Sequence, residues 1–244
     1  YLIAKSWTRS SSFGSYLIRR IARIFPGLAV VILLSVFVMG PIVTSLPLGD
    51  YFADAGTWKY LSLIVLAPIS NVLPGVFDAN PLPYAVNGSL WTLRYEFLAY
   101  LLTPLLYAAT KKLCGGRKLV FAVVLAVLVL VHFLSYSGLY PLPKVLDNLF
   151  RLFAYYMAGV AVLELGLDKY CDSQFAVVAL LVIIVFRDQM GIFSSLIMFV
   201  CVCTFTLGFS LTSNPRFAPC FKKNDYSYGI YIYAFPIQQC VVWL

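Results

Sequence analysis

Three arginines crowd the end of a short basic segment that precedes a long apolar run. Arg19, Arg20 and Arg23 stand at positions i, i+1 and i+4. If residues 16–24 are helical, Arg19 and Arg23 share one face and Arg20 lies beside them. Guanidinium groups make bidentate, permanently charged contacts that fit phosphate oxygens. The patch is therefore a candidate site for the phosphates of a nucleotide-like cosubstrate, although basic residues beside a membrane also serve as topology anchors against anionic lipid.

A second polar group opens an apolar stretch at residues 87–97. Arg94 and Glu96 are charges within an apolar helix, which is costly unless they are paired or line a polar cavity. Because they are two residues apart, they point to different faces and each needs a partner elsewhere. Arg151, expected near the outer side of another span, is a candidate partner for Glu96 in an interhelical salt bridge. Alternatively, Glu96 lines an acceptor pocket, where its carboxylate orients or deprotonates a hydroxyl.

Two sets of aromatic residues are further candidates, one within residues 87–97 and one within residues 224–239. Trp91 and Tyr95 are four residues apart and could form a stacking wall for a sugar ring, although aromatic anchoring at a membrane interface is also common. Residues 224–239 bring several tyrosines, among them Tyr228 and Tyr231, to the start of an apolar run. So many hydroxyls are unusual for a lipid-facing helix, and we expect a polar interior wall at this position.

Histidine, cysteine and the common catalytic motifs do not indicate a further site in this sequence. His132 is the single histidine and lies among aliphatic residues, so we interpret it as a packed or interhelical hydrogen-bonding group. The six cysteines show no CxxC pair or repeated spacing, which favours small apolar residues over disulfides or metal ligands. The sequence contains no zinc-ligand cluster, no G-x-S-x-G elbow and no glycine-rich phosphate loop.

Composition indicates the elements that must position these residues. The chain has 244 residues, of which 61% are hydrophobic and 11% charged, and its mean hydropathy is +0.88. A soluble domain usually carries about 25% charged residues, so we expect a multi-pass membrane protein. The net charge of +8 does not indicate a nucleic-acid partner. Its basic residues cluster in short segments between apolar runs, which is the positive-inside pattern.

The charge pattern orients the expected spans, with residues 1–23 in the cytoplasm. Residues 60–73 form an apolar stretch too short for a span and broken by Pro68, so we expect a re-entrant or interfacial element there. If that stretch does not cross, Lys111, Lys112, Arg117 and Lys118 are cytoplasmic, as are the basic residues at 216–223. The fold class is then all-α, a polytopic transmembrane helical bundle with about seven spans in this sequence: 24–43, 90–109, 119–136, 145–165, 174–186, 191–211 and 228–244.

We expect residues 1–244 to form a single transmembrane domain. No internal repeat, low-complexity tract or soluble linker domain interrupts it. The chain does not begin with Met and stops within an apolar run, so we expect a domain truncated at both ends.

Three motifs follow one another along the chain: R-x-x-R at Arg20 and Arg23, N-G-S-L-W-T-L-R-Y-E at residues 87–96, and D-Y-S-Y-G-I-Y-I-Y-A-F-P at residues 225–236. Together they resemble the acyltransferase 3 family of integral membrane O-acyltransferases, which includes bacterial O-antigen and exopolysaccharide acetylases. The resemblance spans nearly the whole chain and implies about ten transmembrane helices in an intact protein.

The resemblance implies transfer of an acetyl group from cytoplasmic acetyl-CoA to a hydroxyl of a cell-surface or exported carbohydrate, at the bacterial inner membrane. It assigns Arg20 and Arg23, with Arg19 beside them, to acetyl-CoA. Glu96 becomes the catalytic candidate of this chain, and the expected residues of the substrate cavity are Trp91, Tyr95, Arg151, Tyr228 and Tyr231.

Two expectations qualify that assignment. The family's catalytic histidine belongs to a span without a counterpart in this sequence, so we expect residues 1–244 to be inactive by themselves. The alternative function is a non-enzymatic transporter of a glycolipid or small molecule, which would need broken helices along a continuous polar path. The interrupted stretch at residues 60–73 keeps that alternative open.

Overall fold

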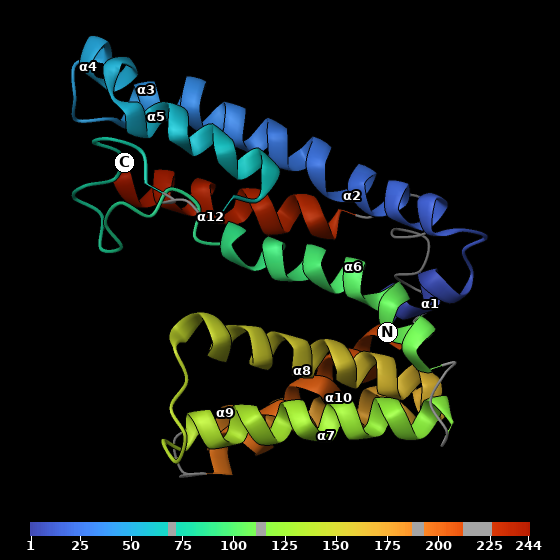
Figure 1. Cartoon of the computed structure of the whole chain (residues 1–244). Coiled ribbons are helices and arrows are strands. Elements are labelled where there is room, and N and C mark those ends of the chain that lie inside the picture. Colours follow the sequence, from blue (N-terminus) through green and yellow to red (C-terminus); the bar gives the residue numbers. More distant parts are fainter. Residues whose placement is uncertain (68–71, 111–115, 187–192, 212–225) are drawn as a thin grey trace. The chain divides into compact units, whose positions relative to one another are not determined.

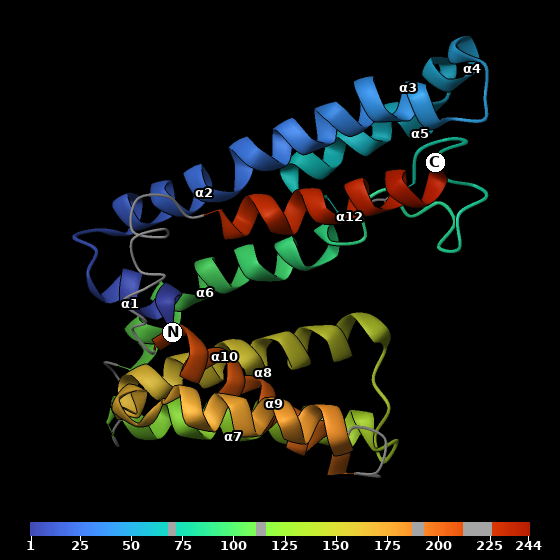
Figure 2. The ribbon, with the colours of Figure 1, turned by 180° about the vertical axis from the view of Figure 1, so that it is seen from behind.

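The computed structural model describes residues 1–67, 72–110, 116–186, 193–211 and 226–244 (Figures 1 and 2). Within these ranges every regular element is a helix, as the sequence predicts. The chain divides into two compact units. Unit 1 comprises Tyr1–Tyr16 and Leu98–Ala218, and unit 2 comprises Leu17–Phe97 and Pro219–Leu244.

Unit 1 is built from regular helices. They are α1 (Leu2–Thr8), the later part of α6 (Leu93–Thr110), α7 (Arg117–Tyr136), α8 (Lys144–Leu165), α9 (Ser173–Phe186) and α10 (Ser194–Leu211). In both ribbon views α7, α8, α9 and α10 lie alongside one another (Figures 1 and 2). Phe121, Met157 and Val160 form a core with Tyr107 and Ala4, so apolar residues of α1, α6, α7 and α8 meet in one cluster.

Unit 2 is less regular. Its helix α2 (Phe13–Leu34) continues through a π-helical turn, Ser35–Met39, into α3 (Gly40–Val43). The short helices α4 (Leu48–Ala53) and α5 (Ala55–Tyr60) follow. The last helix of the chain, α12 (Ser227–Trp243), runs beside α2 in both ribbon views (Figures 1 and 2).

The π-helical turn has an identifiable cause. Gly40 donates its backbone N–H to the carbonyl of Ser35, and the next residue, Pro41, has no N–H for the carbonyl of Val36. The hydroxyl of Tyr51 donates to that carbonyl at 2.9 Å. Burial raises the pKa of Tyr51 to about 12, so the phenol keeps its proton and remains a donor at neutral pH. A side chain thus replaces the backbone donor that proline lacks.

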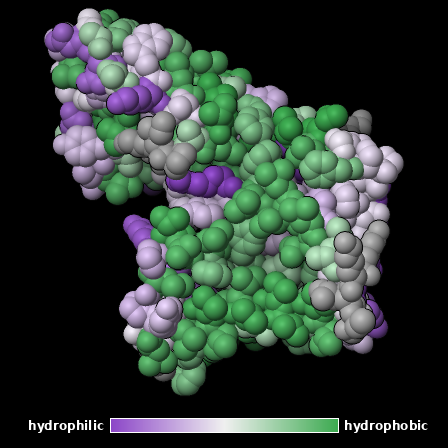
Figure 3. Space-filling view, viewed as in Figure 1, coloured by the Kyte–Doolittle hydropathy of each residue, from purple (hydrophilic) through white to green (hydrophobic). Residues whose placement is uncertain are grey.

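The length and composition of the helices make this a multi-pass membrane protein. Four helices in the described ranges are long and apolar enough to cross a membrane: Phe13–Val43, Arg117–Tyr136, Lys144–Leu165 and Ser194–Leu211. On the face shown in Figure 3, apolar side chains cover α7 and α8 almost without interruption. Leu119, Val123, Val127 and Leu130 of α7 are exposed, and such surfaces are suited to lipid rather than to water.

The predicted count of seven spans is not confirmed. A helix occurs at each predicted position, but α9 is shorter than a span and neither α6 nor α12 is among the four candidates. Helix α6 carries Arg94 and Glu96 near its start, and α12 has 17 residues and is rich in tyrosine. The basic residues expected in cytoplasmic loops at 111–112 and 216–223 lie outside the described residues, so the orientation stays a prediction.

The re-entrant or interfacial element predicted at residues 60–73 is described only in part and stays a prediction. After α5, residues Leu61–Val65 form only a short 3-10 helix, and Pro68 lies outside the described residues. A long irregular segment, residues 74–89, is bound to α12. Asn80 donates to the backbone carbonyl of Gln239 at 3.0 Å, and the Gln239 side chain donates to the carbonyl of Ala85 at 2.7 Å. Polar side chains of this segment and of α12 thus satisfy part of the irregular backbone.

Candidate functional site

The turn that precedes the arginines is anchored by a tyrosine. Tyr16 of α2 is fully buried, and its hydroxyl donates to the backbone carbonyl of Tyr100 at 3.2 Å. That carbonyl lacks its usual helical donor, because Pro104 stands four residues further along α6. The ring of Trp7 packs edge-on against Tyr16, with a centroid separation of 5.4 Å. The start of α2 is therefore fixed at a defined register on α6.

Arg19, Arg20 and Arg23 lie in α2, and the predicted helix over residues 16–24 is confirmed. Arg19 and Arg23 are exposed and Arg20 is partly buried. All three come within the turns that follow Tyr16, so their guanidinium groups lie close to one another on neighbouring faces of the helix. The structure does not test their role toward a cosubstrate, which stays a prediction.

The third motif packs against the first. The hydroxyl of Tyr228, in the first turn of α12, donates to the carbonyl of Ile24 at 2.8 Å. Gly27 makes this approach possible, because a Cβ at that position would lie 3.0 Å from the Tyr228 ring and 3.3 Å from Ile232. Ile24 directly follows Arg23, so the tyrosine-rich helix begins beside the arginine turn.

The second motif is locked to the third. Asn87 is completely buried and donates to the carbonyl of Ile232 at 2.8 Å, the carbonyl that Pro236 leaves without a helical donor. The next residue, Gly88, has no room for a side chain, because a Cβ would lie 2.7 Å from the Phe235 ring. The N-G pair of one motif and the F-P pair of the other are thus complementary parts of a single contact.

This contact sets the position of Glu96. Glu96 lies in the first turn of α6 and is partly buried. Its carboxylate is within electrostatic range of the hydroxyls of Tyr228 and Tyr231. The neighbouring Phe97 packs edge-on against Phe25 of α2 at 5.4 Å between ring centroids. Tyr228 and the residue after Glu96 thus both contact the part of α2 that follows the arginines.

The structure places Glu96 relative to α2 and α12, but it does not test the predicted depth of Glu96 in the membrane. We expect it near the outer side because residues 87–97 open an inward span. The irregular segment 74–89 runs along α12 before α6 begins. Glu96 consequently lies at the level of residues 24–25 of α2. Arg151 belongs to unit 1, where it donates to Asn148 at 2.8 Å. Its pairing with Glu96 stays a prediction.

The aromatic pair beside Glu96 does not present a flat wall. The rings of Trp91 and Tyr95 stand edge to face, 5.9 Å apart at 79°. Tyr231 donates its hydroxyl to the carbonyl of Ser89 at 2.6 Å and also contacts the hydroxyl of Thr92. A cavity lined in part by Trp91 measures about 10 Å³, roughly the room for one water molecule. A place for Trp91 and Tyr95 in a sugar-binding cavity stays a prediction.

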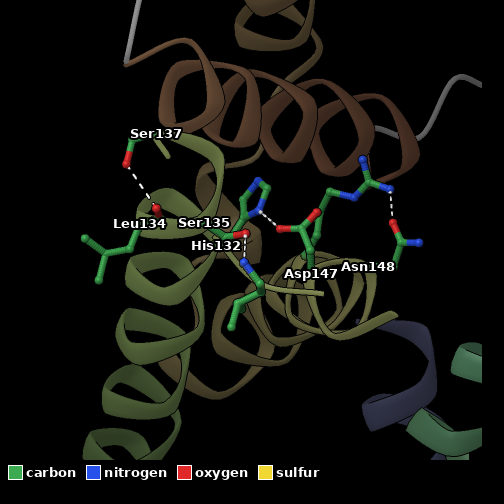
Figure 4. Close-up of polar contacts among 8 residues, drawn as sticks. His132, Leu134, Ser135, Ser137, Asp147 and Asn148 are labelled. Carbon is green, nitrogen blue, oxygen red and sulfur yellow. Dashed lines mark hydrogen bonds and ion pairs between the residues drawn. The ribbon is translucent and has the colours of Figure 1, made fainter. Parts of the chain in front are cut away.

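His132 belongs to unit 1, where it lies on α7 (Figure 4). It is buried, and its Nδ1 atom is 3.8 Å from Oδ1 of Asp147 on α8. Arg151, in the next turn of α8, donates to Asn148 at 2.8 Å. This arrangement agrees with our interpretation of His132 as a group buried between helices. We missed Asp147 as its partner, because only the α7–α8 hairpin brings these two residues together.

A second ion pair was also missed. The carboxylate of Glu164, at the end of α8, accepts a hydrogen bond from the hydroxyl of Tyr107 at 2.6 Å and contacts Nε of Arg117 at 2.7 Å. The Glu164 side chain is only 5% exposed. A carboxylate at the end of an apolar run, on the side where Arg117 was expected, was the signal that could have revealed it.

Comparison with known proteins identifies the family. The family model described as "Acyltransferase domain" matches residues 1–241. The chain belongs to the acyltransferase 3 family. It is also 32% identical over 248 residues to an "O-acetyl transferase" of Shigella phage Sf6, covering 99% of this chain and 71% of that protein. No solved structure matches the chain. The protein is an acyltransferase, and not the non-enzymatic transporter that the sequence left open.

Proposed function

We propose that this acyltransferase moves an acetyl group from cytoplasmic acetyl-CoA to a hydroxyl of a cell-surface or exported carbohydrate, at the bacterial inner membrane. Family membership and the phage O-acetyl transferase support the reaction class. The observation that carries the proposal is the meeting of the three motifs in unit 2. Arg23 directly precedes Ile24, whose carbonyl binds Tyr228, and Tyr228 lies within electrostatic range of Glu96.

The arginines act on the donor. Coenzyme A is a polyanion, and a cluster of guanidinium groups at the inner mouth of a helical unit is suited to its phosphates. Arg20 and Arg23 bind these phosphates, and Arg19 adds positive charge beside them. Tyr16 holds the start of α2 in place through Tyr100, so the guanidinium groups need little reorganisation when the donor binds.

Glu96 acts on the acceptor. The hydroxyl oxygen of the sugar forms a new bond to the acetyl carbonyl carbon, the carbon–sulfur bond of the thioester breaks, and coenzyme A leaves as a thiolate that takes up a proton. The Glu96 carboxylate orients the hydroxyl or accepts its proton. Tyr228 and Tyr231 border the same space and supply hydrogen-bonding hydroxyls.

The experiment uses the protein expressed from its complete gene and inverted membrane vesicles, whose outer face is the cytoplasmic one. Vesicles receive acetyl-CoA labelled in the acetyl group, and label is counted in extracted polysaccharide. We expect labelled carbohydrate from wild-type vesicles only. Arg20→Ala and Arg23→Ala should each raise the KM for acetyl-CoA about tenfold or more, the size expected for losing a hydrogen bond to a charged group.

Arg9→Ala is the matched control, because it removes an exposed arginine from the same basic segment but outside the motif. It should leave the KM unchanged. If Arg20→Ala and Arg23→Ala also leave the KM unchanged while the protein is still inserted, the arginines are a topology anchor. If wild-type vesicles transfer no label to carbohydrate, the proposed donor or acceptor is wrong.

A further inference from the structure

Unit 1 contains a cavity that none of the predicted site residues lines. It measures about 510 Å³ and lies among α1, the end of α6 and the start of α7. Ligand pockets in proteins typically measure about 300–1,000 Å³, so it is large enough for a small organic molecule. Its lining includes Trp7, Thr8, Tyr107, Thr110 and Arg117. By the charge pattern of the sequence this end of the unit is cytoplasmic.

One wall of the cavity carries a guanidinium group, that of Arg117, whose orientation is fixed by its neighbours. Glu164 is almost fully buried and binds Nε of Arg117 at 2.7 Å, while the Arg117 side chain is 54% exposed. Tyr107 donates to the second carboxylate oxygen at 2.6 Å, and the guanidinium lies over its ring at 5.6 Å. Among the described residues no further partner occupies the terminal nitrogens of Arg117. The group is thus oriented from one side and offers two parallel N–H donors on the other, the geometry that suits a phosphate.

A second wall offers an aromatic surface with hydroxyls beside it. Trp7 borders the cavity and is supported edge-on by Tyr16 at 5.4 Å. Thr8 and Thr110 donate their hydroxyl hydrogens to the backbone carbonyls of Lys5 and Tyr107. Because these hydroxyls use their hydrogens in this way, their oxygens could serve a ligand only as acceptors. An indole ring stacks on nucleobases, and neighbouring acceptors can receive an exocyclic amino group.

From this combination we infer that the cavity binds the nucleotide end of the acyl-CoA donor, with the purine against Trp7 and a phosphate on Arg117. The inference rests on the proposed function, in which acyl-CoA is the donor. It goes further by assigning recognition of the nucleotide to residues outside all three motifs. A phospholipid headgroup would offer Arg117 the same phosphate but would have no planar base for Trp7.

The first test compares two donors on the complete protein in membrane vesicles: acetyl-CoA and acetyl-pantetheine, which lacks the nucleotide. Trp7→Leu removes the stacking surface and keeps an apolar side chain. We expect the preference for acetyl-CoA over acetyl-pantetheine, measured as the ratio of their kcat/KM values, to fall about tenfold. Arg117→Lys keeps the charge beside Glu164 but loses the two parallel N–H donors of the guanidinium group, so it should lower the same ratio. Trp58→Leu, on the exposed surface of unit 2, is the matched control and should not change it.

The second test measures binding directly and needs no turnover. Radiolabelled adenosine 3′,5′-bisphosphate should bind wild-type protein and the Trp58→Leu control, and bind Trp7→Leu about tenfold more weakly. An unchanged donor ratio together with unchanged nucleotide binding in Trp7→Leu overturns the inference while leaving acetyl transfer intact. If neither donor supports transfer, the proposed function is refuted. The nucleotide-binding measurement then shows by itself whether the cavity binds a nucleotide.

The lipid alternative has its own outcome. Phosphatidylglycerol is added in increasing proportion to vesicles of zwitterionic lipid. If wild-type protein binds no nucleotide and retains phosphatidylglycerol in a way that Arg117→Lys weakens and Trp7→Leu does not, a headgroup occupies the cavity and the inference is wrong.

Discussion

The two units use polar side chains in different ways. In unit 2, neutral side chains bind backbone carbonyls that proline has left without a donor, as Asn87 does for Ile232 and Tyr51 for Val36. Unit 1 has a contact of this kind as well, from Tyr16 to the carbonyl of Tyr100. Unit 1 also contains charged side chains that bind one another between helices, as Glu164 does with Arg117. The first device lets the backbone depart from a regular helix, and the second ties regular helices together.

The difference bears on the proposed site, because the contacts among the three motifs lie in unit 2. Two of the three motifs meet where Gly88 admits Phe235, and the third joins them where Gly27 admits Tyr228. These contacts are in the irregular unit, and they lead the chain down to Glu96. Several motif residues therefore serve to hold an irregular backbone, and fewer of them are left for direct contact with substrate.

The largest effect is expected where a buried charge loses its partner in unit 1. Arg117→Leu leaves the buried carboxylate of Glu164 without a cation. Breaking such a pair should lower the free energy of unfolding by about 3 kcal/mol. This is the low end of the usual range, because the Arg117 side chain is 54% exposed. Thermal unfolding in detergent micelles measures the change. Lys118→Leu, the exposed neighbour, is the control and should have almost no effect. Equal effects of the two substitutions would mean that Arg117 and Glu164 contribute only as a screened surface pair.

In unit 2, loss of the Asn87 contact should lower the free energy of unfolding by a smaller amount, and a second substitution should restore part of it. Asn87→Ala leaves the carbonyl of Ile232 without a donor, at a cost of about 2 kcal/mol. Pro236→Ala restores a backbone N–H to that carbonyl, so Asn87→Ala should cost at least about 1 kcal/mol less in the Pro236→Ala background. A double-mutant cycle on unfolding midpoints measures the coupling.

Asn80→Ala is the control for that cycle. Asn80 also binds α12, but its acceptor is the carbonyl of Gln239, which no proline leaves orphaned. Its cost should therefore be the same with Pro236 or with Ala at that position. Equal rescue of both asparagines would show that Pro236→Ala merely stabilises α12 in general, and Asn87 would then not be a substitute for the missing backbone donor.

Tyr16 offers a smaller version of the same test. Tyr16→Phe removes the donor to the Tyr100 carbonyl and should cost about 1 kcal/mol, with partial rescue by Pro104→Ala. Because Arg19 and Arg20 follow within one turn of α2, the KM for acetyl-CoA should rise as well, while kcat changes little. Steady-state kinetics and unfolding midpoints on the same preparations measure both effects. A stability loss that leaves the KM unchanged would separate the anchor from the arginine turn.

The regular helices were predictable because long apolar runs carry their own boundaries. The expected spans at residues 119–136 and 145–165 became Arg117–Tyr136 and Lys144–Leu165. The irregular segment 74–89 was not predictable, because its backbone is satisfied by side chains of α12 that are distant in the sequence. Local sequence patterns cannot predict contacts between residues that are so far apart in the sequence.

The candidate site divides in the same way. The prediction of one helix carrying Arg19, Arg20 and Arg23 is confirmed, and the roles of Glu96, Tyr228 and Tyr231 stay predictions. The position of Glu96 beside residues 24–25 of α2 could not be predicted, because it follows from segment 74–89, and its depth in the membrane stays a prediction. The pairing of Glu164 with Arg117 escaped notice because each residue alone resembles an ordinary charge at a helix end.

The smallest effect is expected at His132, and it separates the two kinds of polar contact most sharply. The 3.8 Å between Nδ1 of His132 and Oδ1 of Asp147 is too long for a hydrogen bond, so the pair holds α7 to α8 only weakly. His132→Gln keeps a polar side chain of similar reach and should change the free energy of unfolding by less than about 1 kcal/mol. The rate of acetyl transfer should stay at its wild-type value. A large fall in rate at unchanged stability would mean that unit 1 contributes a reacting group, and the chemistry could then no longer be assigned to the irregular unit alone.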